Sequence, residues 1–300
     1  MTNEEVLFKL EEDVRLRGFT SPTVERYLTT AKVFLRHYEG RQIVDLNEHD
    51  IRDFLKYLMY DKKLVAATVN NYNGVIRFIY EVTLERRLNF KLIPRSKVAR
   101  PLPSLLTVEE IQALFNACGN NLRDRAILMT IYGGGLRLSE LCNLKTSDIY
   151  ASSMRILIRQ GKGKKDRFTI LSKSNLDIIT KYWYAYKPNH SENYLFLSRL
   201  GNPLCTRAVQ KLFQKYLKKA GISKHATVHT LRHDFATHLL QAGTDVFRIK
   251  NLLGHTNLKS TSIYLHLLEF EEELISPLDL MNQNIKVVKT KKSPYIMGVK

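Results

Sequence analysis

Apolar residues recur at helical spacing through residues 1–90 of the chain. Ser21-Pro22 is typical of a helix start, with serine as the N-cap and proline at the first helical position. The apolar stripe that follows has a helical period, and similar stripes begin near Ile51 and Val69. Residues 1–90 are therefore predicted to form a small helical domain.

Residues 91–105 interrupt this pattern with three prolines, several basic side chains and no periodicity, which predicts an interdomain linker. A second domain is expected directly after it, because Thr107 and Glu110 have the spacing of a capping box. Leu106 and Ile111 occupy the two positions of the matching hydrophobic staple. The first helix of this domain should start just after the capping threonine.

The second domain, residues 106–283, is predicted to be mainly helical with one small β-hairpin. Residues 154–159 and 167–172 are rich in β-forming side chains and flank a Gly-Lys-Gly turn, which is typical of a hairpin. Helical periodicity returns after it, and the lysine-rich residues 284–300 are expected to be a frayed tail. The expected fold class is therefore mainly α with a small sheet.

Charge narrows the class of partner. Lys and Arg outnumber Asp and Glu by 47 to 29, which gives a formal net charge of +18 at pH 7. This excess favours a nucleic acid as partner, with a basic protein that has no nucleic-acid role as the alternative. No apolar run is long enough to span a membrane, and the charged N-terminus has no apolar signal core. We therefore expect a cytoplasmic protein that does not bind membranes.

Two arginines fall in segments suited to holding an anion. Arg137 follows the glycine run 133–135 at an expected helix start, where the backbone can approach a ligand and the helix attracts negative charge. Taken alone, an ion pair with Glu140 is the simpler interpretation. Arg232 lies three residues after His229, so both side chains share one helix face, as suits a phosphate with two free oxygens.

Lysines and two further histidines are ambiguous by themselves. Lys162, Lys164 and Lys165 occupy the predicted hairpin turn, where a solvated charged turn competes with a lysine delivered to a phosphate. The turn lacks the spacing of a nucleotide-binding P-loop. His233 and His238 have no third ligand at metal-like spacing, so a zinc site is not expected.

A Leu-Leu-Gly-His sequence ends at His255, and Tyr264 lies nine residues further along the chain. On an unbroken helix these two side chains would face opposite ways, so Thr256-Asn257 is expected to break the helix and let them converge. Alone, Tyr264 is one of 15 tyrosines. The order of all these pieces is more specific than any one of them.

The ordered set of GLRxSEL, a lysine in a β-turn, HxLRHxFATHLL, LLGH and a later tyrosine resembles the tyrosine recombinase (phage integrase) family, in particular its Xer-type site-specific recombinases. The resemblance covers roughly residues 106–270, and residues 1–90 fit the family's SAM-like, core-DNA-binding domain more loosely. It implies a two-domain, C-shaped clamp around double-stranded DNA. It also implies six catalytic residues: Arg137, Lys162, His229, Arg232, His255 and Tyr264.

The resemblance implies covalent catalysis without a metal, ATP or any other cofactor. Tyr264 would attack the scissile phosphate to form a 3′-phosphotyrosyl bond and release a 5′-hydroxyl, so that the bond energy is conserved. Arg137 and Arg232 would hold the phosphoryl oxygens. Two rounds of strand exchange, through a Holliday junction, would recombine two duplexes.

Proton transfer falls to the remaining polar residues by the same resemblance. Lys162 is the lysine between the two glycines, which is the family's position for the general acid that protonates the leaving 5′-oxygen. His229 would assist proton transfer on the nucleophile's side, and His255 would hydrogen-bond the phosphate. Charge alone does not distinguish the three lysines of this turn.

Four active sites serve two duplexes, so the resemblance implies a tetramer on a specific DNA site, made of one recombinase or of two. It also implies a bacterial, nucleoid-associated location. In the family a C-terminal helix docks on the neighbouring subunit, and residues 269–283 are the candidate here, with packing on their own domain as the alternative. The apolar anchors would be Leu274, Ile275, Leu278 and Leu280.

Three other functions compete with recombination. A catalytically silent DNA-binding relative would keep the fold, but every catalytic position carries a competent residue type. A type IB topoisomerase would share the chemistry and relax supercoils alone. An RNA-binding basic protein would carry an aromatic-rich sheet motif, which is absent from the sequence. The sequence leaves open whether the recombinase would resolve chromosome dimers or would integrate and excise a mobile element.

Binding to a labelled DNA duplex should weaken steeply as salt rises, because each phosphate neutralised by Lys or Arg releases condensed counterions. The slope of log K against log salt, measured by fluorescence anisotropy, should be about −0.9 for each phosphate contacted. Addition of EDTA is the control and should leave the affinity unchanged. An affinity that stays constant from low to moderate salt would contradict the clamp.

Overall fold

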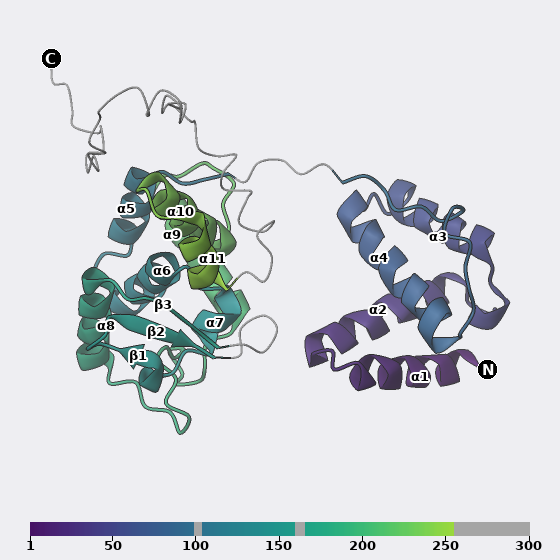
Figure 1. Cartoon of the computed structure of the whole chain (residues 1–300), viewed down its shortest axis with the longest axis horizontal. Helices are drawn as coiled ribbons and strands as arrows, with labels where there is room; N and C mark the ends of the chain where they lie inside the picture. Colours follow the sequence, from purple (N-terminus) through teal and green to yellow (C-terminus); the bar gives the residue numbers. More distant parts are fainter. Residues whose placement is uncertain (99–103, 160–165, 255–300) are drawn as a thin grey trace, which may run out of the picture. The chain divides into compact units, whose positions relative to one another are not determined.

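The structure is a computed structural model that describes residues 1–98, 104–159 and 166–254. The chain divides into two compact units, Met1–Pro101 and Leu102–Lys300 (Figure 1). Each unit has its own hydrophobic core. Both units are mainly helical, and the second holds a small antiparallel sheet, which confirms the expected fold class. Among the described residues, no helix is both long and apolar enough to cross a membrane.

The N-terminal unit contains the three predicted helices and one more. The additional helix follows a capping box, in which the Glu5 backbone N–H donates to the Thr2 hydroxyl over 3.2 Å. The N-cap of the second helix is Thr20 rather than Ser21, so the predicted start was one residue late. The helices are α1 (Asn3–Leu16), α2 (Ser21–His37), α3 (Glu48–Tyr60) and α4 (Ala66–Phe78), with short helical turns at Ile43–Asp45 and Ile79–Thr83.

The first residues of the 91–105 segment pack against the N-terminal unit. The Asn70 side-chain amide accepts from the Ser96 backbone N–H over 3.0 Å and donates to the Ser96 carbonyl over 2.9 Å. The Arg77 guanidinium donates to the carbonyl of Ile93 over 2.7 Å, and Ile93 is fully buried. The composition of residues 91–105 predicts a linker. In the structure, the first residues of this segment are held against the N-terminal unit by side chains of α4.

The second unit surrounds α6 (Leu122–Gly134) (Figure 1). This helix contacts β3 (Arg167–Ile170), α8 (Lys173–Tyr186) and α10 (Val228–Gln241). In the sheet, Ile156 of β2 lies opposite Ile149 of β1 and Thr169 of β3, which confirms the predicted hairpin and adds one short strand. The helices are α5 (Val108–Ala117), α6 (Leu122–Gly134), α7 (Leu138–Cys142), α8 (Lys173–Tyr186), α9 (Thr206–Lys219), α10 (Val228–Gln241) and α11 (Val246–Leu253). The strands are β1 (Ile149–Tyr150), β2 (Arg155–Ile158) and β3 (Arg167–Ile170).

The start of the second unit is tied to α10 through Asp234. The predicted capping box of α5 is present, and the preceding Leu106 donates its backbone N–H to Asp234 Oδ1 over 3.1 Å. Asp234 is fully buried, and its Oδ2 has no hydrogen-bond partner among the described residues. Burial, together with the nearby charge of Glu110, raises the pKa of Asp234 to about 7.

The Asp234→Asn variant should gain stability relative to the unchanged protein as pH rises from about 4 to 7. In that window folded Asp234 keeps a proton that the unfolded chain has released, because its folded pKa of about 7 lies above the ordinary 3.8. The unchanged protein therefore loses free energy of unfolding as pH rises through this window, and the Asp234→Asn variant does not have this loss. Denaturant unfolding at several pH values measures the difference. A difference that does not vary with pH would contradict the raised pKa.

Asp177→Asn is the matched control for that measurement. The Asp177 side chain is 59% exposed and pairs with the exposed Lys181. The free energy of unfolding of the Asp177→Asn variant should change with pH in the same way as that of the unchanged protein.

Candidate active site

A tight glycine turn brings Arg137 to the start of α7. Helix α6 ends at Gly134, and Gly135 adopts a left-handed φ of 61°. A Cβ at Gly134 would lie 2.3 Å from the Leu136 side chain, and one at Gly135 would lie 2.4 Å from Phe235. These glycines therefore allow close packing within the protein, and not the approach of a ligand to the backbone that the glycine run predicts.

The carboxylate of Glu140 is surrounded by three arginines. Arg137 donates its Nη1 to Oε1 and its backbone N–H to Oε2, each over 2.7 Å. Arg167 forms a bidentate pair with the same carboxylate, with distances of 2.7 and 2.8 Å. Arg232 Nη1 lies 3.7 Å from Oε2. The Glu140 side chain is only 5% exposed, so this cluster is largely shielded from solvent.

Burial of the Glu140 carboxyl would by itself raise its pKa. The hydrogen bonds and positive charges of Arg167 and Arg137 outweigh that effect and lower the pKa of Glu140 to about 2. The group is therefore ionised throughout the physiological range. It neutralises one of three positive charges, so the cluster remains positive overall.

The same three arginines donate to successive carbonyls at the end of α11. Arg167 Nε donates to the Leu252 carbonyl over 2.9 Å, and Arg232 Nη2 donates to the Leu253 carbonyl over 2.6 Å. Arg137 Nη2 lies 3.5 Å from the carbonyl of Gly254, which ends the helix with a left-handed φ of 64°. The last carbonyls of a helix lack partners within it and carry partial negative charge, so they attract cations.

His229 lies in the first turn of α10, three residues before Arg232, and only part of its surface is open to solvent. Its imidazole packs at right angles to that of His233, with ring centroids 4.6 Å apart. Desolvation of the ring, followed by the positive charges of Arg232 and Arg137, lowers the pKa of His229 below 6.5. The imidazole is therefore neutral at pH 7 and can accept a proton.

The structure brings Arg137, His229 and Arg232 together from two elements that are far apart in sequence. Lys162 lies outside the described residues, as do Lys164 and Lys165. His255, Tyr264 and the segment 269–283 also lie outside them. The last described residue is Gly254, directly before His255, and β2 and β3 are the described strands before and after residues 160–165.

Two residues of this cluster were not chosen from the sequence. The sequence indicates Glu140 only as an ion-pair partner of Arg137. Its place at the third position of α7 also fits a capping interaction. Arg167 follows the lysine turn and resembles any other basic residue of a hairpin. Within residues 1–98, 104–159 and 166–254, no His, Cys, Asp or Glu side chains are grouped as metal ligands.

Comparison with known proteins identifies the family. The phage integrase family matches residues 104–271, and the N-terminal SAM-like domain of phage integrases matches residues 7–89. The chain belongs to the phage integrase family. Each of the two matches falls within a different one of the two compact units.

Relatives in this family span nearly the whole chain. A putative integrase/recombinase, y4qK, of Sinorhizobium fredii is 38% identical over 261 residues, which cover 86% of this chain and 83% of the relative. Tyrosine recombinase XerA of Pyrococcus horikoshii is 34% identical over 269 residues, covering 88% of this chain and 90% of the relative. These matches place the chain among the tyrosine recombinases of the phage integrase family.

Solved structures of the family have the same fold. The crystal structure of XerA recombinase is 28% identical, with a TM-score of 0.53 over 89% of this chain and 95% of that chain. A lambda integrase dimer bound to a COC′ core site is 20% identical, with a TM-score of 0.72 over 92% of this chain and 81% of that chain. The likeness to lambda integrase is one of fold.

Glu140→Gln should lower the free energy of unfolding by about 3–5 kcal/mol, because it leaves enclosed arginines without their shared counter-charge. Denaturant unfolding followed by the fluorescence of Trp183, the single tryptophan, measures this loss in the second unit. Glu192→Gln is the control, since Glu192 is 58% exposed and its pair with Lys145 should contribute less than about 1 kcal/mol. Equal stability of the two variants would contradict a central role for Glu140.

Proposed function

We propose that this protein is a site-specific DNA recombinase that cuts and rejoins strands through a 3′-phosphotyrosyl intermediate and a Holliday junction. The observation that carries this proposal is that Arg137 and Arg232 meet at one carboxylate, with His229 near enough for both arginines to lower its pKa. Membership of the phage integrase family supports the same reaction class. Double-stranded DNA is the proposed substrate, in keeping with the net charge of +18.

The arginine cluster suits a phosphoryl transition state. Negative charge builds up on the phosphoryl oxygens as a nucleophile attacks, and fixed donors stabilise it without having to reorganise. Arg137 is held by Glu140 and by the end of α11, and its side chain is 22% exposed. It therefore offers a guanidinium that is already oriented, while Arg232 adds positive charge from within the protein.

The remaining catalytic roles follow the motif order. Tyr264 would attack the phosphate, Lys162 would protonate the leaving 5′-oxygen, and His255 would hydrogen-bond the phosphate. Neutral His229 would accept the proton of the nucleophile, as its lowered pKa permits. Each exchange replaces one phosphoester bond with another, so the proposed mechanism needs neither metal nor ATP.

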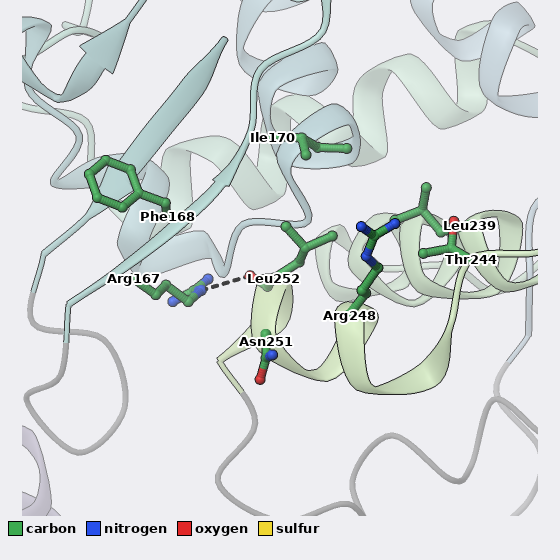
Figure 2. Close-up of a pocket in the computed structure, with 8 residues that line it drawn as sticks. All are labelled: Arg167, Phe168, Ile170, Leu239, Thr244, Arg248, Asn251 and Leu252. Carbon is green, nitrogen blue, oxygen red and sulfur yellow. Dashed lines mark hydrogen bonds between the residues drawn. The ribbon is translucent and has the colours of Figure 1, made fainter. Parts of the chain in front are cut away.

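The proposed assembly is a tetramer in which residues 1–90 and 106–283, joined by 91–105, enclose DNA. A related lambda integrase has been solved as a tetramer bound to a Holliday junction. Residues 269–283 would dock on a neighbouring subunit. The partly exposed Phe168 and Ile170 of β3 offer it an apolar surface (Figure 2). The protein would act inside the cell on chromosomal or mobile-element DNA.

Tyr264→Phe should abolish covalent attachment to DNA while leaving DNA binding nearly unchanged, because only the attacking hydroxyl is lost. The substrate is a duplex selected by the unchanged protein from a randomised pool and then nicked beside the cleavage point to trap the adduct. A denaturing gel measures the adduct. Tyr184→Phe, at a tyrosine that is 74% exposed on α8, is the control and should form the adduct normally.

An adduct that persists in the Tyr264→Phe variant would contradict the assignment of the nucleophile. The absence of any adduct with the unchanged protein would favour the catalytically silent alternative. Relaxation of supercoiled plasmid, without joining of two sites, would favour a topoisomerase.

A further inference from the structure

We propose that Arg167 is a positioning residue that links three parts of the catalytic site: the arginine cluster, the end of α11, and strands β2 and β3, between which Lys162 falls in the sequence. This inference rests on the proposed recombinase function and deepens it. Arg167 is 10% exposed at its side chain, so its guanidinium is directed into the protein rather than offered to a substrate. Its effect on catalysis must therefore pass through the groups that it holds.

The first link is to the arginine cluster. Both terminal nitrogens of Arg167 bind the Glu140 carboxylate, at 2.7 and 2.8 Å, in the bidentate geometry that fixes a carboxylate most firmly. The same carboxylate holds the side chain and the backbone of Arg137. The orientation of Arg137 therefore depends on a carboxylate that Arg167 keeps in place.

The second link is to the end of α11. Figure 2 shows Arg167 directed at Leu252, whose carbonyl accepts from Nε over 2.9 Å. Two residues later, a Cβ at Gly254 would lie 2.6 Å from Arg167 Cδ, so a glycine is required for this approach. The Arg167 side chain thus packs against the turn that leads directly into His255.

The third link runs through the backbone of β3. Arg167 is the first residue of this strand and pairs with Ile158, the last residue of β2. The segment between these two positions contains Lys162. One side chain therefore anchors the start of β3, and with it the end of β2, to Glu140 and to α11. Lysine could not replace it, because a single ammonium cannot supply both the bidentate fork and the separate Nε donor.

Arg159 provides a matched control, because it directly follows β2 and so precedes residues 160–165, whereas Arg167 follows them. Its Nε donates to Asp148 Oδ1 over 2.6 Å, and its side chain is 51% exposed. No hydrogen bond or ion pair between Arg159 and Glu140 or α11 is present in the described part of the chain. Arg159→Lys therefore changes the charge geometry near the turn without touching the three links.

The experiment compares Arg167→Lys, Arg159→Lys and the unchanged protein in single-turnover cleavage of the nicked duplex. Arg167→Lys should cleave about 10- to 100-fold more slowly, because displaced catalytic groups lose their orientation. Its DNA affinity should remain close to that of Arg159→Lys, and its melting temperature should fall only moderately, because lysine keeps the positive charge beside Glu140. A cleavage rate equal to that of Arg159→Lys would overturn the proposal.

A second substrate separates positioning from general loss of structure. Sulfur in place of the bridging 5′-oxygen leaves without protonation, so it compensates for a misplaced general acid but not for misplaced arginines. This substrate should restore part of the rate of Arg167→Lys, all of the rate of Lys162→Ala and none of the rate of Glu140→Gln. Equal slowing of Arg167→Lys on both substrates, or a collapse of its melting temperature, would overturn the positioning role.

The two proposals can fail separately in this experiment. If the unchanged protein forms no adduct with either substrate, the recombinase function itself is wrong. If the unchanged protein forms the adduct and Arg167→Lys forms it equally fast, only the role of Arg167 is wrong.

Discussion

The second unit depends on one shielded carboxylate. Glu140 receives donors from Arg137 and Arg167 and lies 3.7 Å from Arg232, so α7, β3 and α10 all meet at a single negative charge. Three guanidinium groups at such distances repel each other strongly where water is excluded. The carboxylate and the carbonyls at the end of α11 make their coexistence possible. Without them, repulsion between the arginines would weaken the packing of α7, β3 and α10 around the site.

This charge balance also explains the chemistry that we propose. One carboxylate against three guanidinium groups leaves positive charge at the site. The carbonyls at the end of α11 hold the guanidinium groups in place, and their partial charges do not cancel this positive charge fully. The same positive field, added to desolvation, lowers the pKa of His229 and keeps its imidazole neutral. The cluster can therefore attract a phosphate and supply a proton acceptor beside it.

Sequence patterns predicted the local features of the fold well and the long-range contacts poorly. The capping box at Thr107 and the hairpin depend on residues a few positions apart, and both were confirmed. The apolar stripes in residues 1–90 do not single out α1, although Thr2 and Glu5 have the spacing of a capping box at its start. Arg167 and Glu140 are 27 residues apart, and no periodicity of β3 or α7 reports their pairing. Likewise, nothing near Asp234 in the sequence indicates that it binds Leu106, 128 residues away.

The weakness of each motif by itself has a structural reason. Each motif carries only one side of a contact that another motif completes. Gly135 of the first motif is a glycine because Phe235 of α10 lies against it, and Gly254 is a glycine because Arg167 lies against it. An isolated Gly-Leu-Arg or Leu-Leu-Gly-His therefore has little meaning, because its glycine is required only when the partner segment is present. The ordered set is specific because it brings together Glu140, Arg137, Arg232 and Gly254, which all belong to one network of contacts.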